Sequence, residues 1–250
     1  MSDKAVKRPE LRSTKVFCVG WHKTGTTSMG WALHRLGYRV LGARLDMAEP
    51  LFAGKEDEAV SLLADFDACQ DVPWAALYRQ LDETYPGSKF ILTTRDEQAW
   101  LTSASNHFGG NDIPLHRWLY GQGEILGNES LYLERYRRHN REVRDYFADR
   151  PGDFLELDLA TADGWPVLCQ FLDRAVPRRR FPHVNKVWHK QTAMEKAPEL
   201  IKRNLPRPML SKLSDLKWFV LGLFGVPDER DVFHNKAQNQ KEIARYRGLQ

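Results

Sequence analysis

Short apolar runs alternate with helical repeats of apolar residues along this chain of 250 residues. Residues 16–19 form an apolar run that ends at Gly20, which is the pattern of a buried parallel strand. Apolar residues then recur at helical spacing from Met29 onward, and Gly37 follows where the left-handed residue that ends a helix belongs. Residues 89–107 repeat this order of strand and helix. The alternation predicts an α/β fold in which helices flank a parallel sheet.

The remaining segments follow the same two periodicities. The pattern predicts strands at residues 38–41 and 154–157, and helices at 47–52, 57–66, 73–84, 113–120, 130–148 and 164–172. We expect one domain over residues 15–185, preceded by a flexible arm at 1–14 and followed by a mostly helical extension at 186–250. The extension is basic, with 13 Lys and Arg against 7 Asp and Glu, and we expect it to pack on the domain or cap it.

A polar loop joins the first predicted strand to the first predicted helix. Such a loop directs backbone N–H groups and a helix N-terminus toward one point, which predicts an anion site. Lys23 adds a positive charge to it, and hydroxyl donors follow at the helix start. Gly20 and Gly25 have the spacing of a triphosphate-binding loop, but Thr26 stands where that motif has its lysine. The alternative is an ordinary glycine-containing turn between a strand and a helix.

A second strand-to-helix stretch carries Arg95 at the end of its strand and Ser103 eight residues later. Ligands bind at the carboxyl edge of open α/β sheets, and the fork of an arginine matches a phosphate. Alone, Arg95 and Ser103 would be an ion-pair partner and a surface hydroxyl. Together with the first loop, they predict a ligand that carries two separated phosphates.

These two stretches resemble the nucleotide-binding signatures of P-loop sulfotransferases, most closely those of a branch of small bacterial and invertebrate enzymes. The resemblance covers roughly residues 15–185, and it rests on the following residues: Lys23-Thr24-Gly25-Thr26-Thr27-Ser28 and Lys89-Phe90-Ile91-Leu92-Thr93-Thr94-Arg95, with Ser103 after them. It implies a P-loop-type sheet, 3′-phosphoadenosine 5′-phosphosulfate as the sulfuryl donor and adenosine 3′,5′-bisphosphate as the product. It also implies a small-molecule acceptor with a hydroxyl or amine, and no metal.

The resemblance assigns roles to single residues. The backbone amides of the loop, with Thr26 and Thr27, would hold the 5′-phosphate. Lys23 would neutralise charge on the leaving oxygen, and Arg95 with Ser103 would hold the 3′-phosphate. The nucleotide-binding residues expected on this basis are His22, Lys23, Thr24, Gly25, Thr26, Thr27, Ser28, Arg95 and Ser103.

Asp71 stands where cytosolic sulfotransferases have their catalytic histidine, before a proline that begins a helix. The resemblance makes Asp71 the expected base, while an N-cap is the structural alternative. An aspartate has an ordinary pKa of about 3.9, and we expect nearby Lys23 to lower the pKa of Asp71 further. His22 and His107 are competing bases.

Composition limits the partners and the compartment. A net charge of +4 suits anionic ligands and does not call for nucleic acid. The three cysteines match no metal-binding spacing, and the N-terminal stretch does not resemble a signal peptide, so we expect a cytoplasmic protein. The apolar segment at 216–226 is too short to span a bilayer, but it could cap the core, cover the acceptor site or touch a membrane surface. The oligomeric state stays open.

Two other functions fit parts of the pattern. One is an ATP-dependent small-molecule kinase with a divergent loop, which the displaced lysine and the pair of Arg95 and Ser103 disfavour. The other is a non-catalytic nucleotide-binding module, which would bind the bisphosphate without turnover.

Overall fold

The computed structural model describes residues 14–183. The predicted N-terminal arm, apart from Thr14, lies outside the described residues. So do the predicted extension at 186–250 and its apolar segment at 216–226. Within the described part of the chain, no helix is both long enough and apolar enough to cross a membrane.

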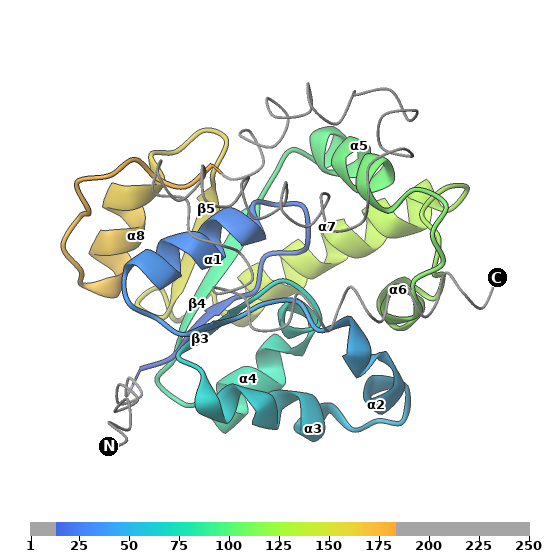
Figure 1. The fold of residues 1–250 in the computed structure, drawn as a ribbon, viewed down its shortest axis with the longest axis horizontal. Helices are drawn as coiled ribbons and strands as arrows, with labels where there is room; N and C mark the ends of the chain where they lie inside the picture. Colours follow the sequence, from blue (N-terminus) through green and yellow to red (C-terminus); the bar gives the residue numbers. More distant parts are fainter. Residues whose placement is uncertain (1–13, 184–250) are drawn as a thin grey trace, which may run out of the picture.

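The described residues form an α/β fold around a five-stranded sheet in the order β2-β3-β1-β4-β5. Every neighbouring pair of strands is parallel, which confirms the predicted fold class. The strands are β1 Val16–Cys18, β2 Val40–Leu41, β3 Ala68–Gln70, β4 Lys89–Thr94 and β5 Phe154–Asp158. Since β1 lies at the centre, the loop after it is flanked by the ends of β3 and β4 (Figure 1).

Helices cover both faces of the sheet (Figure 1). They are α1 Thr26–Arg35, α2 Ala48–Phe52, α3 Glu56–Ser61, α4 Tyr78–Thr84, α5 Glu97–Phe108, α6 Pro114–Tyr120, α7 Glu129–Tyr146 and α8 Gly164–Leu172. Short 3₁₀ turns at Leu45–Met47, Leu62–Asp65 and Trp74–Leu77 precede α2, follow α3 and precede α4.

The alternation of side chains along β1 explains why the core has two halves. Val16 and Cys18 face a layer that includes residues of α1 and α8, such as Leu33 and Trp165. Phe17 and Val19 face the other layer, to which α2 to α7 contribute. All residues of β1 are fully buried, as a central parallel strand requires.

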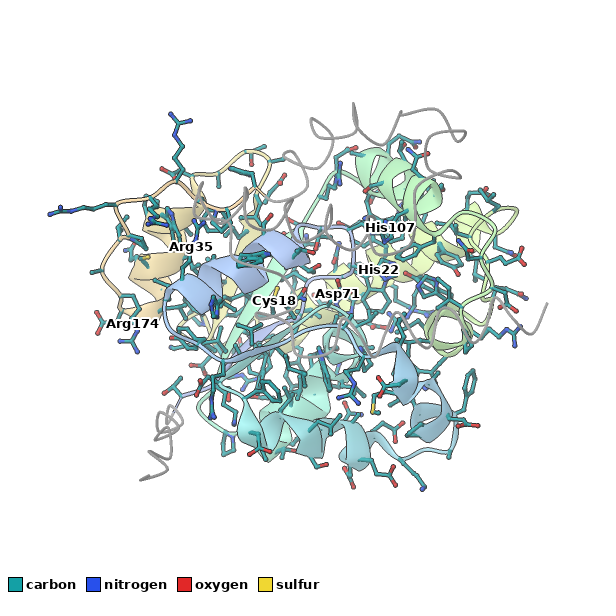
Figure 2. All side chains as sticks on the ribbon, in the orientation of Figure 1. Cys18, His22, Arg35, Asp71, His107 and Arg174 are labelled. Carbon is teal, nitrogen blue, oxygen red and sulfur yellow. The ribbon has the colours of Figure 1, made fainter. Side chains whose placement is uncertain are left out.

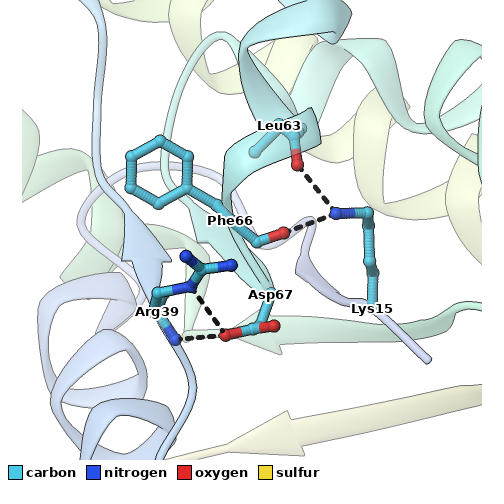
Figure 3. A network of polar contacts seen from close by, with 5 residues as sticks. All are labelled: Lys15, Arg39, Leu63, Phe66 and Asp67. Carbon is cyan, nitrogen blue, oxygen red and sulfur yellow. Dashed lines mark hydrogen bonds and ion pairs between the residues drawn. The ribbon is translucent and has the colours of Figure 1, made fainter. Parts of the chain in front are cut away.

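A polar network fixes the amino edge of the sheet, opposite the edge where ligands bind in such folds (Figure 3). Lys15, just before β1, donates from Nζ to the carbonyls of Leu63 at 2.8 Å and Phe66 at 2.5 Å. The Asp67 carboxylate, just before β3, accepts from the backbone N–H of Arg39 at 2.9 Å and is 3.4 Å from its Nε. These contacts tie the starts of β1, β2 and β3 together.

The structure confirms the long predicted elements and departs from the prediction at three places. The predicted helix over residues 73–84 is a 3₁₀ turn at Trp74–Leu77 followed by α4, and the predicted helix over 57–66 likewise ends in a 3₁₀ turn. Strand β3 was not predicted, because its three residues carry no β-branched or aromatic side chain. The omission matters, since β3 is the strand that brings Asp71 to the edge of the sheet beside the loop after β1.

Candidate active site

The loop after β1 is shaped by close backbone packing and two left-handed residues. A side chain at Gly20 would meet the backbone N and O of Thr93 at 2.6 Å, so β1 and β4 can approach only because residue 20 is glycine. Lys23 has φ 66° and Gly25 has φ 98°. Gly25 is the N-cap of α1, and no side chain caps this helix or places an acid in its first turn. The first-turn N–H groups of such a helix are available to an anion.

A chain of buried hydroxyl groups holds the loop against β4. Thr24 Oγ1 donates to the carbonyl of Trp21 at 2.6 Å, which uses its only proton. The 2.7 Å contact between Thr24 Oγ1 and Thr93 Oγ1 must therefore be donated by Thr93. Cys18 Sγ lies 3.9 Å from Thr93 Oγ1, and burial raises the pKa of Cys18 to about 12, so this thiol keeps its proton. All three side chains are buried.

Arg95 follows the last residue of β4, and its side chain is exposed. Its Nη1 donates to the backbone carbonyl of Lys23 at 3.2 Å, so the guanidinium lies against the loop after β1. The Tyr136 hydroxyl of α7 accepts from the Arg95 N–H at 3.0 Å and donates to the Arg95 carbonyl at 2.8 Å, which fixes the backbone of this residue. Ser103 lies on α5 and is half-buried.

Asp71 follows β3 and has φ 74°, in the left-handed region. Its Oδ2 accepts from the Thr26 hydroxyl at 2.8 Å, and its Oδ1 accepts from the N–H of Val72 at 2.8 Å. The next helical turn begins at Trp74 with Pro73 as its N-cap. The carboxylate of Asp71 is therefore directed to the start of α1 and does not cap a helix.

The pKa values of Asp71 and Lys23 are shifted in opposite directions. Burial raises the pKa of Asp71 above its ordinary value, although the hydrogen bonds from Val72 and Thr26 and the charge of Lys23 act in the opposite direction. Lys23 acts on the pKa of Asp71 in the expected direction, but the expected net lowering is wrong, because burial outweighs the charge. Burial also lowers the pKa of Lys23, while the carboxylate of Asp71 opposes this shift.

His22 is buried among aromatic rings next to Lys23. Its Nε2 lies 2.5 Å from the Tyr120 hydroxyl, which also accepts from Trp21 Nε1 at 2.5 Å. Its backbone carbonyl accepts from Trp100 Nε1 at 2.8 Å. Burial lowers the pKa of His22 well below its ordinary value, and burial together with Lys23 lowers the pKa of His107 to about 4. In Figure 2, His22, His107 and Asp71 lie in one region beyond the N-terminal end of α1.

The structure thus brings together most of the site residues that the sequence predicted. Hydrogen bonds connect Thr26 to Asp71 and Arg95 to Lys23, and the remaining loop residues from His22 to Ser28 lie between these contacts or next to them. Sequence reasoning gave no role at the site to Thr93 or Tyr136. The signal for Thr93 was a hydroxyl residue within an apolar strand, and nothing local distinguishes Tyr136 from a core tyrosine.

An uncapped helix N-terminus after β1, an arginine after the neighbouring strand β4 and an acid after β3 lie at one edge of the parallel sheet of this α/β protein. The family model of the sulfotransferase domain matches residues 15–122 and 113–189, and the chain belongs to this family. The chain is also similar to "Ava biosynthesis cluster protein M" of Aspergillus versicolor. The two are 27% identical over 214 residues, with 68% of this chain and 80% of that protein covered.

Proposed function

We propose that the protein transfers the sulfuryl group of 3′-phosphoadenosine 5′-phosphosulfate to a hydroxyl or amine of a small-molecule acceptor, without a metal. The observation that carries this proposal is the convergence of two cationic groups from separate strands. Lys23 belongs to the loop after β1, Arg95 follows β4, and the guanidinium donates to the Lys23 carbonyl at 3.2 Å. A ligand with phosphates on the 3′ and 5′ oxygens of one ribose suits two such sites.

The residues present fit the donor nucleotide. The N-terminus of α1 has no side-chain cap, which supports binding of the 5′-phosphate by its backbone N–H groups, and a Cβ at Gly25 would meet Leu159 Cδ1 at 2.9 Å, so the close packing of this turn requires glycine. In the proposal, the backbone N–H groups of this loop hold the 5′-phosphate with Thr26 and Thr27, and Arg95 and Ser103 hold the 3′-phosphate. When bound, the nucleotide supplies a sulfuryl group that leaves its phosphate oxygen.

In the proposal, Lys23 and Asp71 have different roles in the transfer. Lys23 is a cation in the loop itself, where it stabilises negative charge that develops on a leaving oxygen. Asp71 accepts the proton of the acceptor. Its raised pKa makes it a better base than an ordinary aspartate, because an efficient base has a pKa closer to the working pH. The hydrogen bond from the Thr26 hydroxyl holds its carboxylate beside the loop during this step.

Calorimetric binding of adenosine 3′,5′-bisphosphate and of ATP with Mg²⁺, to the native chain and to Arg95→Ala, tests the proposal. We expect the native chain to prefer the bisphosphate, and Arg95→Ala to weaken its binding by about 10- to 100-fold, as loss of a hydrogen-bonded charge pair does. Adenosine 5′-monophosphate should bind both proteins equally.

Arg137→Ala is the matched control, because Arg137 pairs with Glu97 at the surface of α5 and α7. It removes the same charge close to Arg95 and should leave bisphosphate binding unchanged. Stronger binding of ATP with Mg²⁺, with no effect of Arg95→Ala, would reject the sulfotransferase proposal in favour of a kinase.

A further inference from the structure

Helix α8 carries no charged residue, although it lies at the edge of the fold (Figure 1). Its inner face consists of buried residues at helical spacing: Trp165, Leu168, Cys169 and Leu172. Its outer face carries three exposed residues and a half-buried ring: Pro166, Val167, Gln170 and Phe171. The solvent face of a surface helix normally carries charged residues, so this outer face requires an explanation.

The loop after α8 carries four exposed arginines: Arg174, Arg178, Arg179 and Arg180. Val176 lies among them and is 54% exposed, and Val167 on α8 is 37% exposed. Residues 164–183 contain these four arginines and a single acid, Asp173. Helix α8 and residues 173–180 therefore form a surface that is both apolar and cationic, which we call the α8 face.

The charges of the four arginines are not used within the described part of the chain. Among residues 14–183, the ion pairs involve other arginines and lysines. Arg174 Nη1 donates only to the backbone carbonyl of Asp173, at 3.3 Å. By contrast, the arginines on the exposed side of α7 have carboxylate partners, such as Glu97 for Arg137 at the surface. The α8 face is therefore an unneutralised cationic surface.

Two hydrogen bonds hold the backbone of this loop along α8. Trp165 Nε1, in the first turn of α8, donates to the carbonyl of Arg179 at 2.7 Å. Arg35 Nη1, at the end of α1, donates to the carbonyl of Arg180 at 3.1 Å. Arg174 follows the other end of α8, so the loop runs back along the outside of the helix (Figure 1). Arginines consequently lie at both ends of the uncharged helix.

The α8 face lies apart from the candidate active site. Helix α1 begins beside the site at Thr26 and ends at Arg35, and a helix of 10 residues is about 15 Å long. In Figure 2, Arg35 and Arg174 lie on the side of α8, whereas His22 and His107 lie beyond the opposite end of α1. A partner bound to the α8 face would leave the nucleotide site open.

We propose that the α8 face docks the protein on an anionic membrane surface, with the arginines on lipid phosphates and Val167 and Val176 in the interfacial layer. The guanidinium fork matches phosphate oxygens, and apolar residues beside basic ones are typical of surfaces that bind anionic lipid. An acidic peptide would also suit the arginines. The uncharged outer face of α8 favours the bilayer, whose interface accepts apolar side chains together with charge. The inference does not depend on the proposed function.

The first test is co-sedimentation of the full chain with vesicles, compared with Arg178→Gln, Arg179→Gln and Arg180→Gln combined in one variant. The vesicles contain phosphatidylcholine alone, or phosphatidylcholine and phosphatidylserine at a ratio of about 7 to 3. We expect the native chain to prefer the anionic vesicles. The triple variant should bind them about 100-fold more weakly, since each arginine near an anionic surface contributes about fivefold. Its binding of adenosine 3′,5′-bisphosphate should stay within about twofold of native, which shows that it folds.

The matched control combines Arg137→Gln, Arg138→Gln and Arg141→Gln. It removes the same charge from α7, where these arginines pair with acids at the surface. We expect it to weaken vesicle binding by no more than about threefold, because surface ion pairs add little to stability and α7 lies outside the α8 face. Equal losses in the two triple variants would show that only net charge matters, and would overturn the proposal.

The second test seeks a gain of binding, which misfolding cannot produce. Tryptophan favours the membrane interface, so Val176→Trp should tighten binding to the anionic vesicles by about 3- to 10-fold. Leu131→Trp, at a position 41% exposed on α7, should leave it unchanged. No gain in Val176→Trp would overturn the proposal. So would native binding by the first triple variant, which would place the membrane contact elsewhere in the chain. Binding of polyglutamate without binding of vesicles would indicate an acidic protein partner instead.

Discussion

Two hydrogen bonds hold the Asp71 carboxylate, one from the Thr26 hydroxyl and one from the N–H of Val72. In an asparagine at the same place, the side-chain oxygen accepts from Val72 and the NH₂ group donates to the Thr26 hydroxyl oxygen, so both contacts remain with one of them reversed. Because burial disfavours the ionised form, Asp71 contributes a charge that the fold does not need. At the scale of single residues, the charge of Asp71 therefore serves the proposed function and not the stability of the fold.

Asp71→Asn should therefore lower turnover by about 100-fold or more while stability stays equal to native or rises. The folded-state pKa is raised above the unfolded value of about 3.9, so the native chain loses stability as pH rises through the interval between the two values, and this loss persists at pH 7. Thermal unfolding at pH 4 and pH 7 should show a smaller difference for the variant than for the native chain.

Asp163→Asn is the control for Asp71→Asn. Asp163 is the N-cap of α8, where its carboxylate accepts from the N–H of Trp165 at 3.4 Å, and asparagine is an equally good cap. Turnover and the midpoint of unfolding should both remain native. Full turnover by Asp71→Asn would show that the base lies elsewhere, with His107 as the next candidate.

At the scale of elements, Thr93 connects the two halves of the proposed nucleotide site. It belongs to β4, two residues before Arg95, and its hydroxyl donates to Thr24 in the loop after β1. Thr93→Val keeps the shape and removes this donor. We expect it to weaken adenosine 3′,5′-bisphosphate binding by about 2- to 10-fold, the range for one neutral hydrogen bond.

Serine retains the hydroxyl, so Thr93→Ser should restore much of the affinity that Thr93→Val loses. Thr102→Val is a suitable control, because Thr102 is exposed on α5 and its hydroxyl bonds only to Gln98 within the same helix. Calorimetry measures the affinity of the three variants for adenosine 3′,5′-bisphosphate. Native affinity in Thr93→Val would mean that backbone packing at Gly20 positions the loop without the hydroxyl.

The periodicity of the sequence was sufficient for long elements and failed for a short one. Strand β4 and helix α5 have clear patterns and strong boundaries, and the structure confirms them. Strand β3 is held by its neighbours β1 and β2, so its existence depends on pairing that a local pattern does not contain. The same limit applies to Asp71, whose contact with Thr26 spans 45 residues of sequence.

The residue types in the sequence predicted the loop of the candidate site better than they predicted the residues that orient this loop. The loop from His22 to Ser28 was recognisable because glycine, lysine and hydroxyl residues at a strand end have a specific use. The partners that orient this loop come from distant elements: Tyr120 from α6, Tyr136 from α7 and Thr93 from β4. Their roles arise only once the sheet order is known.

At the scale of the whole molecule, a bound bisphosphate would join loops that follow separate strands of the sheet. A ligand that binds only the folded chain raises the free energy of unfolding by about 2.7 kcal/mol at 100 times its dissociation constant. For a chain of this size, we expect adenosine 3′,5′-bisphosphate to raise Tm by roughly 5–10 °C under these conditions. Scanning calorimetry measures the shift directly.

The salt dependence of this Tm shift tests whether Arg95 binds the second phosphate. Arg95 is exposed, so its attraction for a phosphate is screened as ionic strength rises, whereas the backbone N–H groups of α1 are screened less. The shift from the bisphosphate should therefore fall more steeply between 50 mM and 500 mM NaCl than the shift from adenosine 5′-monophosphate. In Arg95→Ala the two nucleotides should show the same salt dependence. If the shift from the bisphosphate still falls more steeply with salt in Arg95→Ala, the second phosphate binds another cation. The assignment of Arg95 to the 3′-phosphate would then be wrong.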